Sequence, residues 1–234
     1  MIKAVFFDLY NTLARFWPPR EELQSRVAQE LGLQVYTEAI LQGYLQADDF
    51  MARENKVRHI EKRTPEEQRA FFARYEQLVM QGASPPVSLE LASQMWARLR
   101  QLPYQLELFD DALPTLQTLK GKELKIGLIS NIYRNLDQLC QRLGITAYLD
   151  FAITSRDVGM EKPHPPIFLA ALEKAQVQPS EALHIGDQYN ADVLGARGVG
   201  IRPVLIDREG LQGHVNDCLK VNSLAEVLPL LKEQ

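Results

Sequence analysis

Cysteine is scarce in this chain of 234 residues, which contains only Cys140 and Cys218. Two thiols are too few for a disulfide framework, and neither belongs to a C-x-x-C pair. Cys140 falls beside the apolar stripe of a predicted helix, so we expect it to be a buried structural thiol. The four histidines lack the spacing of metal ligands, so the sequence offers no zinc site.

Long apolar runs and long basic runs are also missing. No apolar stretch reaches the ~18 residues that a membrane-spanning helix requires, and the N-terminus lacks the layout of a secretory signal. With a net charge of −4 and no basic run, the chain lacks the concentration of positive charge that is typical of general nucleic-acid binding. These absences argue against membrane and nucleic-acid partners and favour a cytoplasmic protein. They leave the oligomeric state open.

The composition that remains is that of an ordinary globular protein, with 46% apolar and 24% charged residues. A chain of this length can bury a substantial core without crosslinks or structural metals. Apolar runs of strand length recur, and several carry β-branched residues, as expected of strands that are buried on both faces. These runs are Ile2–Phe7, Leu124–Ile129, Phe151–Thr154, Ala182–Ile185 and Pro203–Ile206.

Helical patterns alternate with these runs after about residue 105. Asp110–Lys120 and Asn131–Leu143 each carry an apolar stripe at helical spacing, and Asp110 is the expected N-cap of the first. Ser223 and Glu226 form a capping-box signature before a last helix. Strands that alternate with helices predict an α/β fold, a Rossmann-like open parallel sheet wrapped by helices.

The segment between the first strand and this alternating region is different. It holds about ninety residues of helical pattern without a clear strand, and Pro18-Pro19 and Pro103 bracket it. We therefore predict a catalytic core made of residues 1–15 and 105–234, and an inserted α-helical cap domain made of residues 16–104. A cap of this kind is expected to open and close over the strand ends and to exclude water.

Polar segments follow four of the predicted strands, where open α/β sheets place their ligands. Asp8-Leu9-Tyr10-Asn11-Thr12 follows the first strand, and then come Ser130-Asn131, Lys162-Pro163, and Gly186-Asp187 with Asp192. Singly, each has a structural explanation, because an acid or serine after a strand often caps a helix and a lone lysine is often a solvated charge. Their order along the chain favours one shared site.

The charges at this site suggest a metal ion. Asp8, Asp187 and Asp192 would bring three negative charges together, and like charges ~4 Å apart repel by roughly 4 kcal/mol at an effective dielectric constant near 20. Lys162 compensates one of them. A hard divalent cation with oxygen ligands would compensate the rest, and Mg²⁺ fits best. It would also neutralise an incoming phosphate.

The ordered set D-x-x-x-T, S-N, K-P and G-D-x-x-x-x-D resembles the haloacid dehalogenase superfamily over essentially the whole chain. The arrangement of a core around a helical insert is similar to members with an α-helical cap. Tyr10 and Gly186-Asp187-Gln188-Tyr189 resemble the branch of the haloacid-dehalogenase-like-domain-containing 3 protein. The motifs are specific for fold and metal site, and much less so for substrate.

The resemblance implies an Mg²⁺-dependent phosphatase that acts on a small phosphorylated metabolite. Asp8 would attack phosphorus and form an aspartyl-phosphate. Lys162 would pair with Asp8 and with the phosphate and stabilise the transition state. Ser130 and the Asn131 backbone would bind the phosphoryl group, and Thr12 would support the first loop.

The resemblance also implies a ligand set for Mg²⁺. Asp8, Asp187 and the carbonyl oxygen of Tyr10 would bind the ion directly. Asp192 would act through water or would orient the other ligands.

Two positions depart from the family pattern. Phosphatases of the superfamily usually carry a general acid–base aspartate two residues after the nucleophile, where this chain has Tyr10. General acid–base catalysis contributes roughly 10²–10⁴ in rate, so slow turnover of alkyl esters is expected. His164 stands where relatives commonly have aspartate. We expect it to cap the helix that begins with Pro165-Pro166.

Two alternative functions stay open. Tyrosine at position 10 is also a feature of the 2-haloacid dehalogenases, which use the same nucleophile on carbon without metal, but those enzymes replace the acid found here at Asp187. A phospho-ligand-binding or regulatory protein without turnover is the other alternative. A basic cluster at residues 53–59 could face a phosphorylated substrate or form a solvated helix face.

Overall fold

The computed structural model describes residues 1–132 and 136–231. The chain forms two compact units, one made of Met1–Arg15 with Leu106–Gln234 and the other of Phe16–Gln105. We call the first of these the sheet unit and the second the helical unit.

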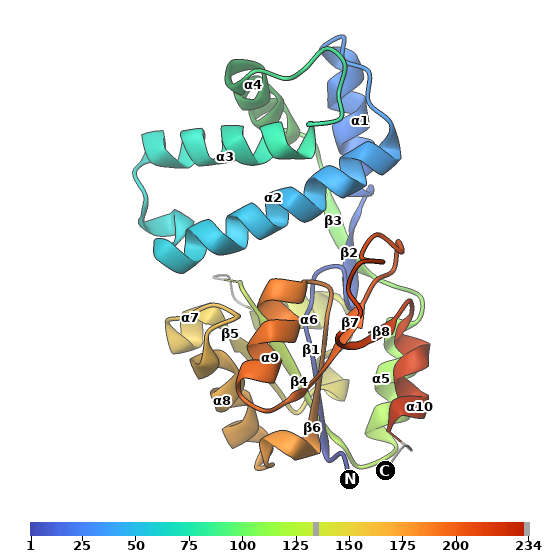
Figure 1. Cartoon of the computed structure of the whole chain (residues 1–234). Coiled ribbons are helices and arrows are strands. Elements are labelled where there is room, and N and C mark those ends of the chain that lie inside the picture. The colour runs from blue at the N-terminus through green and yellow to red at the C-terminus, as the bar shows by residue number, and fades with distance from the viewer. Residues whose placement is uncertain (133–135, 232–234) are drawn as a thin grey trace. The chain divides into compact units, whose positions relative to one another are not determined.

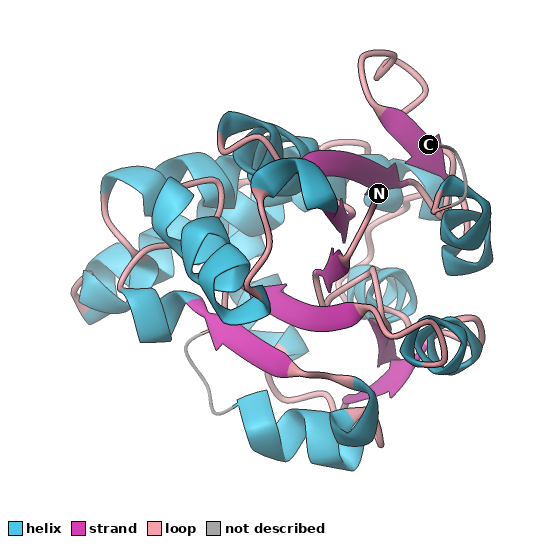
Figure 2. Ribbon diagram, turned by 90° about the horizontal axis from the view of Figure 1, so that it is seen from below, coloured by secondary structure: helices cyan, strands magenta, loops and turns pink. Residues whose placement is uncertain are grey.

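The sheet unit is built on six parallel strands with helices on both sides (Figure 2). Their spatial order is β5-β4-β1-β6-β7-β8. The strands are β1 (Ala4–Phe7), β4 (Lys125–Ser130), β5 (Phe151–Thr154), β6 (Ala182–Gly186), β7 (Arg202–Ile206) and β8 (Leu219–Val221). The predicted α/β fold with an open parallel sheet is confirmed.

Alternate residues of the strands supply the two apolar faces of the sheet, because side chains alternate along a strand. Val5 and Phe7 of β1 belong to one core, and Ala4 and Phe6 belong to the other. The first core is covered by α5 (Ala112–Lys120), α6 (Leu136–Arg142) and α10 (Val227–Leu230). The second is covered by α8 (Pro165–Ala175) and α9 (Leu194–Gly198).

The strand order reverses direction at β1. The chain adds β4 and β5 on one side of β1, and then β6, β7 and β8 on the other. In open α/β sheets such a reversal opens a crevice at the carboxyl ends of the strands, where ligands bind. β1, β4 and β6 therefore end side by side at the place where this crevice forms.

Three short strands were not predicted. β2 (Ala14–Trp17) and β3 (Gln105–Leu108) pair in a separate two-stranded sheet, and β8 adds an edge to the main sheet. The prediction of no strand directly after the first one was therefore wrong. A strand of three or four residues is too short for an alternating pattern to stand out.

Three predicted helix caps also differ from the structure. The N-cap position before α5 is Asp111 rather than Asp110, and its side chain makes no capping bond. Ser223 donates to the Glu226 carboxylate instead of capping the backbone. His164 does precede α8, but its side chain makes no capping bond. Part of the helix predicted at 131–143 lies outside the described residues.

The helical unit contains α1 (Arg20–Glu30), α2 (Thr37–Val57), α3 (Pro65–Val79) and α4 (Leu89–Leu99). α2 and α3 run alongside each other (Figure 1), and Gly43 lets their backbones approach, since a Cβ at Gly43 would lie 2.1 Å from the Val79 carbonyl oxygen. The unit has its own apolar core. Within the described residues, none of these or the other helices combines the length and apolarity needed to cross a bilayer.

A carboxyl group lies inside this core. Glu76 of α3 is fully buried and accepts a hydrogen bond from Gln24 Nε2 of α1 at 3.0 Å. Oε1 of Glu76 and Oε1 of Gln24 have no hydrogen-bond partner among the described residues. Burial raises the pKa of Glu76 from 4.5 to about 8, so the acid is neutral near pH 7.

We expect Glu76→Gln to become more stabilising, relative to the natural protein, as pH rises from 4.5 to about 8. In this window the unfolded chain has released the Glu76 proton and the folded chain retains it, so the natural protein loses up to about 1.4 kcal/mol per pH unit. Glutamine has no proton to release. Chemical unfolding followed by far-ultraviolet circular dichroism measures the difference at each pH.

Glu90→Gln, on the exposed surface of α4, is the matched control and should give a flat difference across the same window. A flat difference for Glu76→Gln as well would mean that Glu76 is ionised in the folded protein.

Candidate active site

The loop after β1 places Asp8 at the centre of the sheet. The amide of Asp8 donates to the Ile185 carbonyl of β6 at 2.9 Å, which continues the parallel pairing one residue beyond the strand. Asn11 has φ +54°, a left-handed conformation that asparagine tolerates better than most residues. The amides of Leu13 and Ala14 then return to the Leu9 carbonyl, which closes the turn.

Lys162 lies between two buried carboxylates. Its ammonium donates to Asp8 Oδ1 at 2.5 Å and to Asp192 Oδ1 at 2.6 Å. Asp8, Lys162 and Asp192 are only 7, 3 and 1% exposed. Charge-assisted hydrogen bonds between an ammonium and a carboxylate are roughly twice as strong as those between neutral groups. The predicted pairing of Lys162 with Asp8 is present, and Asp192 is a second partner.

The two carboxylates differ in their pKa. Burial and the negative charge of Asp192 raise the pKa of Asp8 to about 6, although Lys162 opposes this rise. Lys162 and His184 hold the pKa of Asp192 far below its usual range. The two carboxylates together raise the pKa of Lys162. Lys162 therefore offsets only part of the effect of burial and of Asp192 on the Asp8 carboxyl.

The backbone of Lys162 is held by Asn131. Asn131 Oδ1 accepts the Lys162 amide at 2.7 Å, and Asn131 Nδ2 donates to the Lys162 carbonyl at 3.0 Å. This reciprocal pair fixes the loop between α7 (Ser155–Val158) and α8 to the end of β4. Only a backbone role at the phosphate was predicted for Asn131, so its side chain adds a second function. Ser130, beside it, is the buried last residue of β4.

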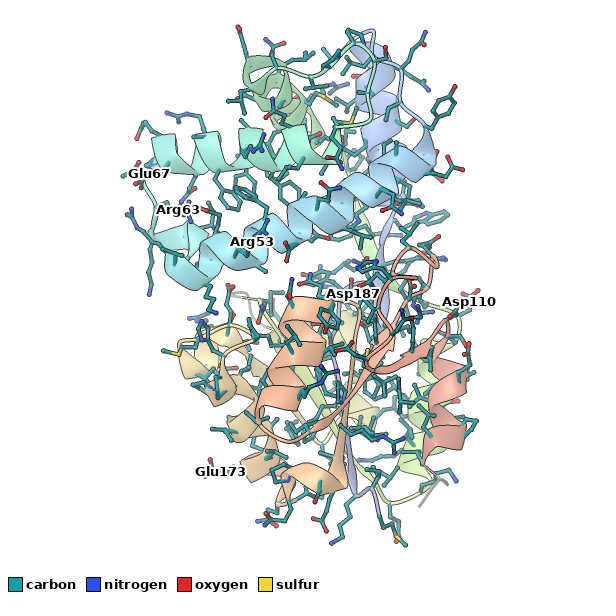
Figure 3. All side chains as sticks on the ribbon, viewed as in Figure 1. Arg53, Arg63, Glu67, Asp110, Glu173 and Asp187 are labelled. Carbon is teal, nitrogen blue, oxygen red and sulfur yellow. The ribbon has the colours of Figure 1, made fainter. Side chains whose placement is uncertain are left out.

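Asp187 follows directly after β6. It lies at the end of the sheet unit opposite Glu173 of α8 (Figure 3). Its Oδ2 accepts from Asn11 Nδ2 at 3.1 Å, and its carbonyl accepts from Gln212 Nε2 at 2.9 Å. Asn11 thus connects Asp187 to the loop that carries Asp8.

Asp192 folds back against the end of β6. A Cβ at Gly186 would lie 2.1 Å from Asp192 Cγ, so only glycine leaves room for this carboxylate. The Asp192 carboxylate accepts from the Gln188 amide as well as from Lys162 and His184 Nε2. Gly186 therefore provides the space that the Asp192 carboxylate occupies.

Thr12 is fully buried in the first loop. Its Oγ1 has no hydrogen-bond partner among the described residues, but its carbonyl accepts from Arg208 Nη2 at 2.7 Å. Arg208 is held in turn by both carboxylate oxygens of Asp111, each at 3.0 Å, and lies 3.7 Å above the Phe109 ring centre. Arg208 therefore supports this loop through the Thr12 carbonyl, and the supporting role of the Thr12 side chain stays a prediction.

Asp8, Asp187 and Asp192 were predicted to surround a metal ion. In the parts of the chain that the structure describes, no three histidine, cysteine, aspartate or glutamate side chains form a metal-binding group. The oxygen atoms of Asp192 are occupied by Lys162, His184 and Gln188, which suits the predicted orienting role better than direct ligation. Two carboxylates and the Tyr10 carbonyl remain as candidate ligands.

The basic cluster at residues 53–59 is paired with acids of its own unit. Arg53 Nη1 lies 3.1 Å from Asp49, and Arg58 Nη1 lies 2.9 Å from Glu67. Figure 3 labels Arg53 on α2 and Glu67 near the start of α3. These pairs favour the solvated helix face over a phosphate-binding surface.

Several known hydrolases are similar to this chain in sequence. The model of haloacid dehalogenase-like hydrolases matches residues 2–200. A ribulose-1,5-bisphosphate 5-phosphatase from Halopiger xanaduensis is 32% identical over 88% of this chain and 85% of its own length. A glyceraldehyde 3-phosphate phosphatase from Methanopyrus kandleri is 29% identical over 89% and 85%.

Proteins named haloacid dehalogenase-like hydrolase domain-containing protein 3 also match. The human protein is 28% identical over 98% of this chain and 94% of its own length. The mouse protein is 35% identical, but that match spans 55% of this chain and about half, 53%, of the relative.

Two solved structures cover nearly the whole chain. A phosphatase of this type from Thermococcus onnurineus has a TM-score of 0.59 at 24% identity and covers 98% of each chain. A 2-haloacid dehalogenase from Pseudomonas syringae pv. Tomato DC3000 has a TM-score of 0.57 at 25% identity and covers 99% of each chain.

Sequence reasoning missed His184 and Arg208. His184 was assigned only to a core strand, yet its imidazole contacts Asp192. The available signal was a polar residue in an apolar run, Ala182–Ile185. No local pattern marks Arg208, because its partners lie far away in the sequence.

Gly186→Ala should lower the free energy of unfolding by roughly 1–3 kcal/mol, the usual cost of overpacking. The added methyl would overlap the Asp192 carboxylate, so Asp192 must move and its bond to Lys162 must lengthen. Chemical unfolding of the purified variant measures the loss.

Gly198→Ala, in nearby α9, is the matched control because a Cβ at Gly198 meets nothing within 4 Å. It should leave stability unchanged or raise it slightly. Equal stability of the two variants would contradict the close contact between Gly186 and Asp192.

Proposed function

Because this chain belongs to the haloacid dehalogenase-like hydrolases, as its motifs predicted, we propose that it is an Mg²⁺-dependent phosphatase that uses Asp8 as the nucleophile. The observation that best supports this proposal is the buried Lys162 ammonium held between Asp8 and Asp192. This arrangement holds the positive charge of Lys162 in direct contact with the carboxylate of the proposed nucleophile, Asp8.

The relatives support the class of substrate. Two of them are named as phosphatases of small phosphorylated metabolites, a ribulose bisphosphate and a glyceraldehyde phosphate. We propose the same class of substrate for this chain, but neither of the two compounds. A phosphate monoester of a small metabolite is the proposed substrate.

The proposed reaction has two steps. A carboxylate oxygen of Asp8 attacks phosphorus while the bond from phosphorus to the alcohol oxygen breaks, and that oxygen takes up a proton from solvent. Water then attacks the phosphorus of the aspartyl-phosphate and gives up a proton to solvent. The bond between phosphorus and the Asp8 oxygen breaks in this step, which releases phosphate and restores Asp8. Asp8 forms the only covalent link between protein and substrate.

Lys162 is proposed to stabilise both transition states. An ammonium has three N–H donors, and two of them contact Asp8 and Asp192. We assign the third to an oxygen of the phosphoryl group. Ser130, the Asn131 backbone and Thr12 are proposed to bind the same group or to support the loop around it.

The residues present fit Mg²⁺. The ion prefers oxygen ligands, and it is commonly held by one or two carboxylates while it retains several waters. Asp8, Asp187 and the Tyr10 carbonyl are the proposed ligands, and Asp192 is proposed to orient Lys162 instead. Burial raises the pKa of Asp8 to about 6 despite Lys162, and a divalent cation bound to Asp8 would oppose this rise. Bound Mg²⁺ would favour the ionised nucleophile and neutralise phosphoryl oxygens.

We propose that the helical unit, Phe16–Gln105, acts as the cap that selects the substrate. Its insertion in the chain directly after the loop of Asp8 supports this role. The cytoplasm stays the predicted location, in agreement with two free cysteines.

A 2-haloacid dehalogenase is the second candidate because Tyr10 replaces the usual acid and because one solved relative carries that name. Asp187 argues against it, since a metal-free reaction on carbon needs no such ligand. Halide release from a 2-haloacid in the presence of chelator would favour this candidate. Tight phosphate-ester binding without turnover would favour a binding protein.

We expect aryl and acyl phosphates to be hydrolysed about 10²–10⁴ times faster than alkyl phosphates. Their leaving groups need little protonation, and Tyr10 is a poor proton donor near neutral pH because an ordinary tyrosine pKa is near 10. Phosphate release from matched aryl and alkyl esters with Mg²⁺ measures the ratio. Equal turnover of the two classes would contradict the loss of a general acid.

Asp8→Asn should lower turnover by at least about 1000-fold, as expected for removal of a nucleophile. Asp217→Asn is the matched control, because Asp217 pairs with Arg197 on the exposed surface of the same unit. We expect the control to retain activity within about twofold.

Removal of Mg²⁺ with chelator should abolish turnover in the natural protein, and metal-independent phosphate release would contradict the metal role.

A further inference from the structure

His184 is a polar residue beside the apolar core that α8 and α9 cover. It lies on β6, and its imidazole has 0% exposure. Its ring meets the Phe168 ring edge-on, with centroids 5.2 Å apart. A buried polar ring among apolar side chains is unfavourable unless its nitrogens find partners.

Only one nitrogen of this ring has a partner among the described residues. His184 Nε2 lies 2.8 Å from Asp192 Oδ1, and Nδ1 is buried without a hydrogen-bond partner. Since Asp192 Oδ1 can only accept, Nε2 must carry the proton. A charged ring would bury an additional Nδ1–H donor without a partner, so we assign the neutral Nε2–H tautomer, with the lone pair of Nδ1 unpaired.

The acceptor of this hydrogen bond also holds the catalytic lysine. Asp192 Oδ1 receives Lys162 at 2.6 Å and His184 at 2.8 Å, and Asp192 Oδ2 receives the Gln188 amide at 3.1 Å. Three donors from three parts of the chain fix the orientation of one carboxylate. Lys162 in turn contacts Asp8, so a continuous series of contacts joins His184 to the nucleophile.

We propose that His184 is a positioning residue for the reaction at Asp8, an inference that rests on the proposed function. By donating to Asp192 Oδ1, it fixes that carboxylate and shares its negative charge, so that Lys162 stays between Asp192 and Asp8. Without this donor, Asp192 would turn toward Lys162 and draw the ammonium away from Asp8. His184 itself touches neither substrate nor metal.

His184→Leu tests the proposal because leucine removes the donor together with the unpaired Nδ1. The variant should unfold at the same or a higher denaturant concentration than the natural protein. Its kcat on an aryl phosphate should nevertheless fall about 10–100-fold, the range found when a partner behind a directly acting residue is lost. KM should change less than kcat, because the phosphate contacts proposed for Ser130 and the Asn131 backbone do not depend on the Lys162 ammonium.

His184→Gln is the conservative variant that should restore function. The amide nitrogen of glutamine can take the place of Nε2, and kcat should return to within about fivefold of the natural value. His184→Asn has an amide too short to reach Asp192, and it should resemble His184→Leu in kcat. A purely structural His184 would give no such difference between glutamine and asparagine at equal stability.

Phe168→Leu is the packing control. It disturbs the ring that lies against His184 and keeps the hydrogen bond, so it should lower stability and leave kcat within about twofold. A folded His184→Leu protein with natural kcat would overturn the proposal. So would a loss of kcat in Phe168→Leu equal to that in His184→Leu.

Nitrogen-15 NMR of the imidazole provides a readout that needs no enzyme activity. The natural protein should give the neutral Nε2–H tautomer of His184, and the signal should shift in Asp192→Asn. An Nδ1–H tautomer or a charged ring would overturn the inference. A natural protein that hydrolyses none of the phosphate esters would instead sink the proposed function, and the NMR result would still stand on its own.

Discussion

The arrangement at the end of the sheet depends on the contact of one buried ammonium with two carboxylates. Lys162 must leave water almost completely, which is tolerable only because Asp8 and Asp192 both lie within hydrogen-bond distance. Several other features follow from this requirement. Asn131 holds the backbone of the lysine, and Gly186 leaves room for the carboxylate of Asp192. Removing any one of these supports would leave a charge buried with poorer compensation.

The same contact separates the two acids chemically. Asp192 receives three donors and stays ionised, whereas Asp8 has one strong donor and a raised pKa. As the proposed nucleophile, Asp8 should keep an electron pair available for attack, whereas Asp192 should share its lone pairs with the donors that it holds. The difference in pKa between the two carboxylates suits both roles. Two aspartates of identical structure thus differ because of their neighbours, which is also why a second cation beside Asp8 agrees with the geometry.

The sequence predicted the sheet and the grouping of the motifs because both depend on strong, repeated signals. Runs such as Leu124–Ile129, which contains most of β4, are long enough to identify as strands, and parallel strands bring their carboxyl ends to one edge. The short strands β2, β3 and β8 and the capping bonds could not be predicted, because each depends on tertiary contacts. Asp111 is an example, since it pairs with Arg208 and the Leu224 amide instead of capping α5. The role of the Asn131 side chain likewise needs a partner 31 positions away, Lys162. The role of His184 depends on how the segment after β6 folds Asp192 back toward it.

The strand order also has a consequence for synthesis of the protein. β1 is made first, yet its two neighbours are β4 and β6, so one edge lacks its partner until residue 130 has left the ribosome and the other until residue 186 has done so. Asp8 and Lys162 are separated by 154 positions, and Asp192 comes later still. Such long-range pairing slows folding and exposes unpaired edges meanwhile. A truncated chain that ends before β6 would therefore carry the nucleophile on an incomplete sheet and would be prone to aggregate.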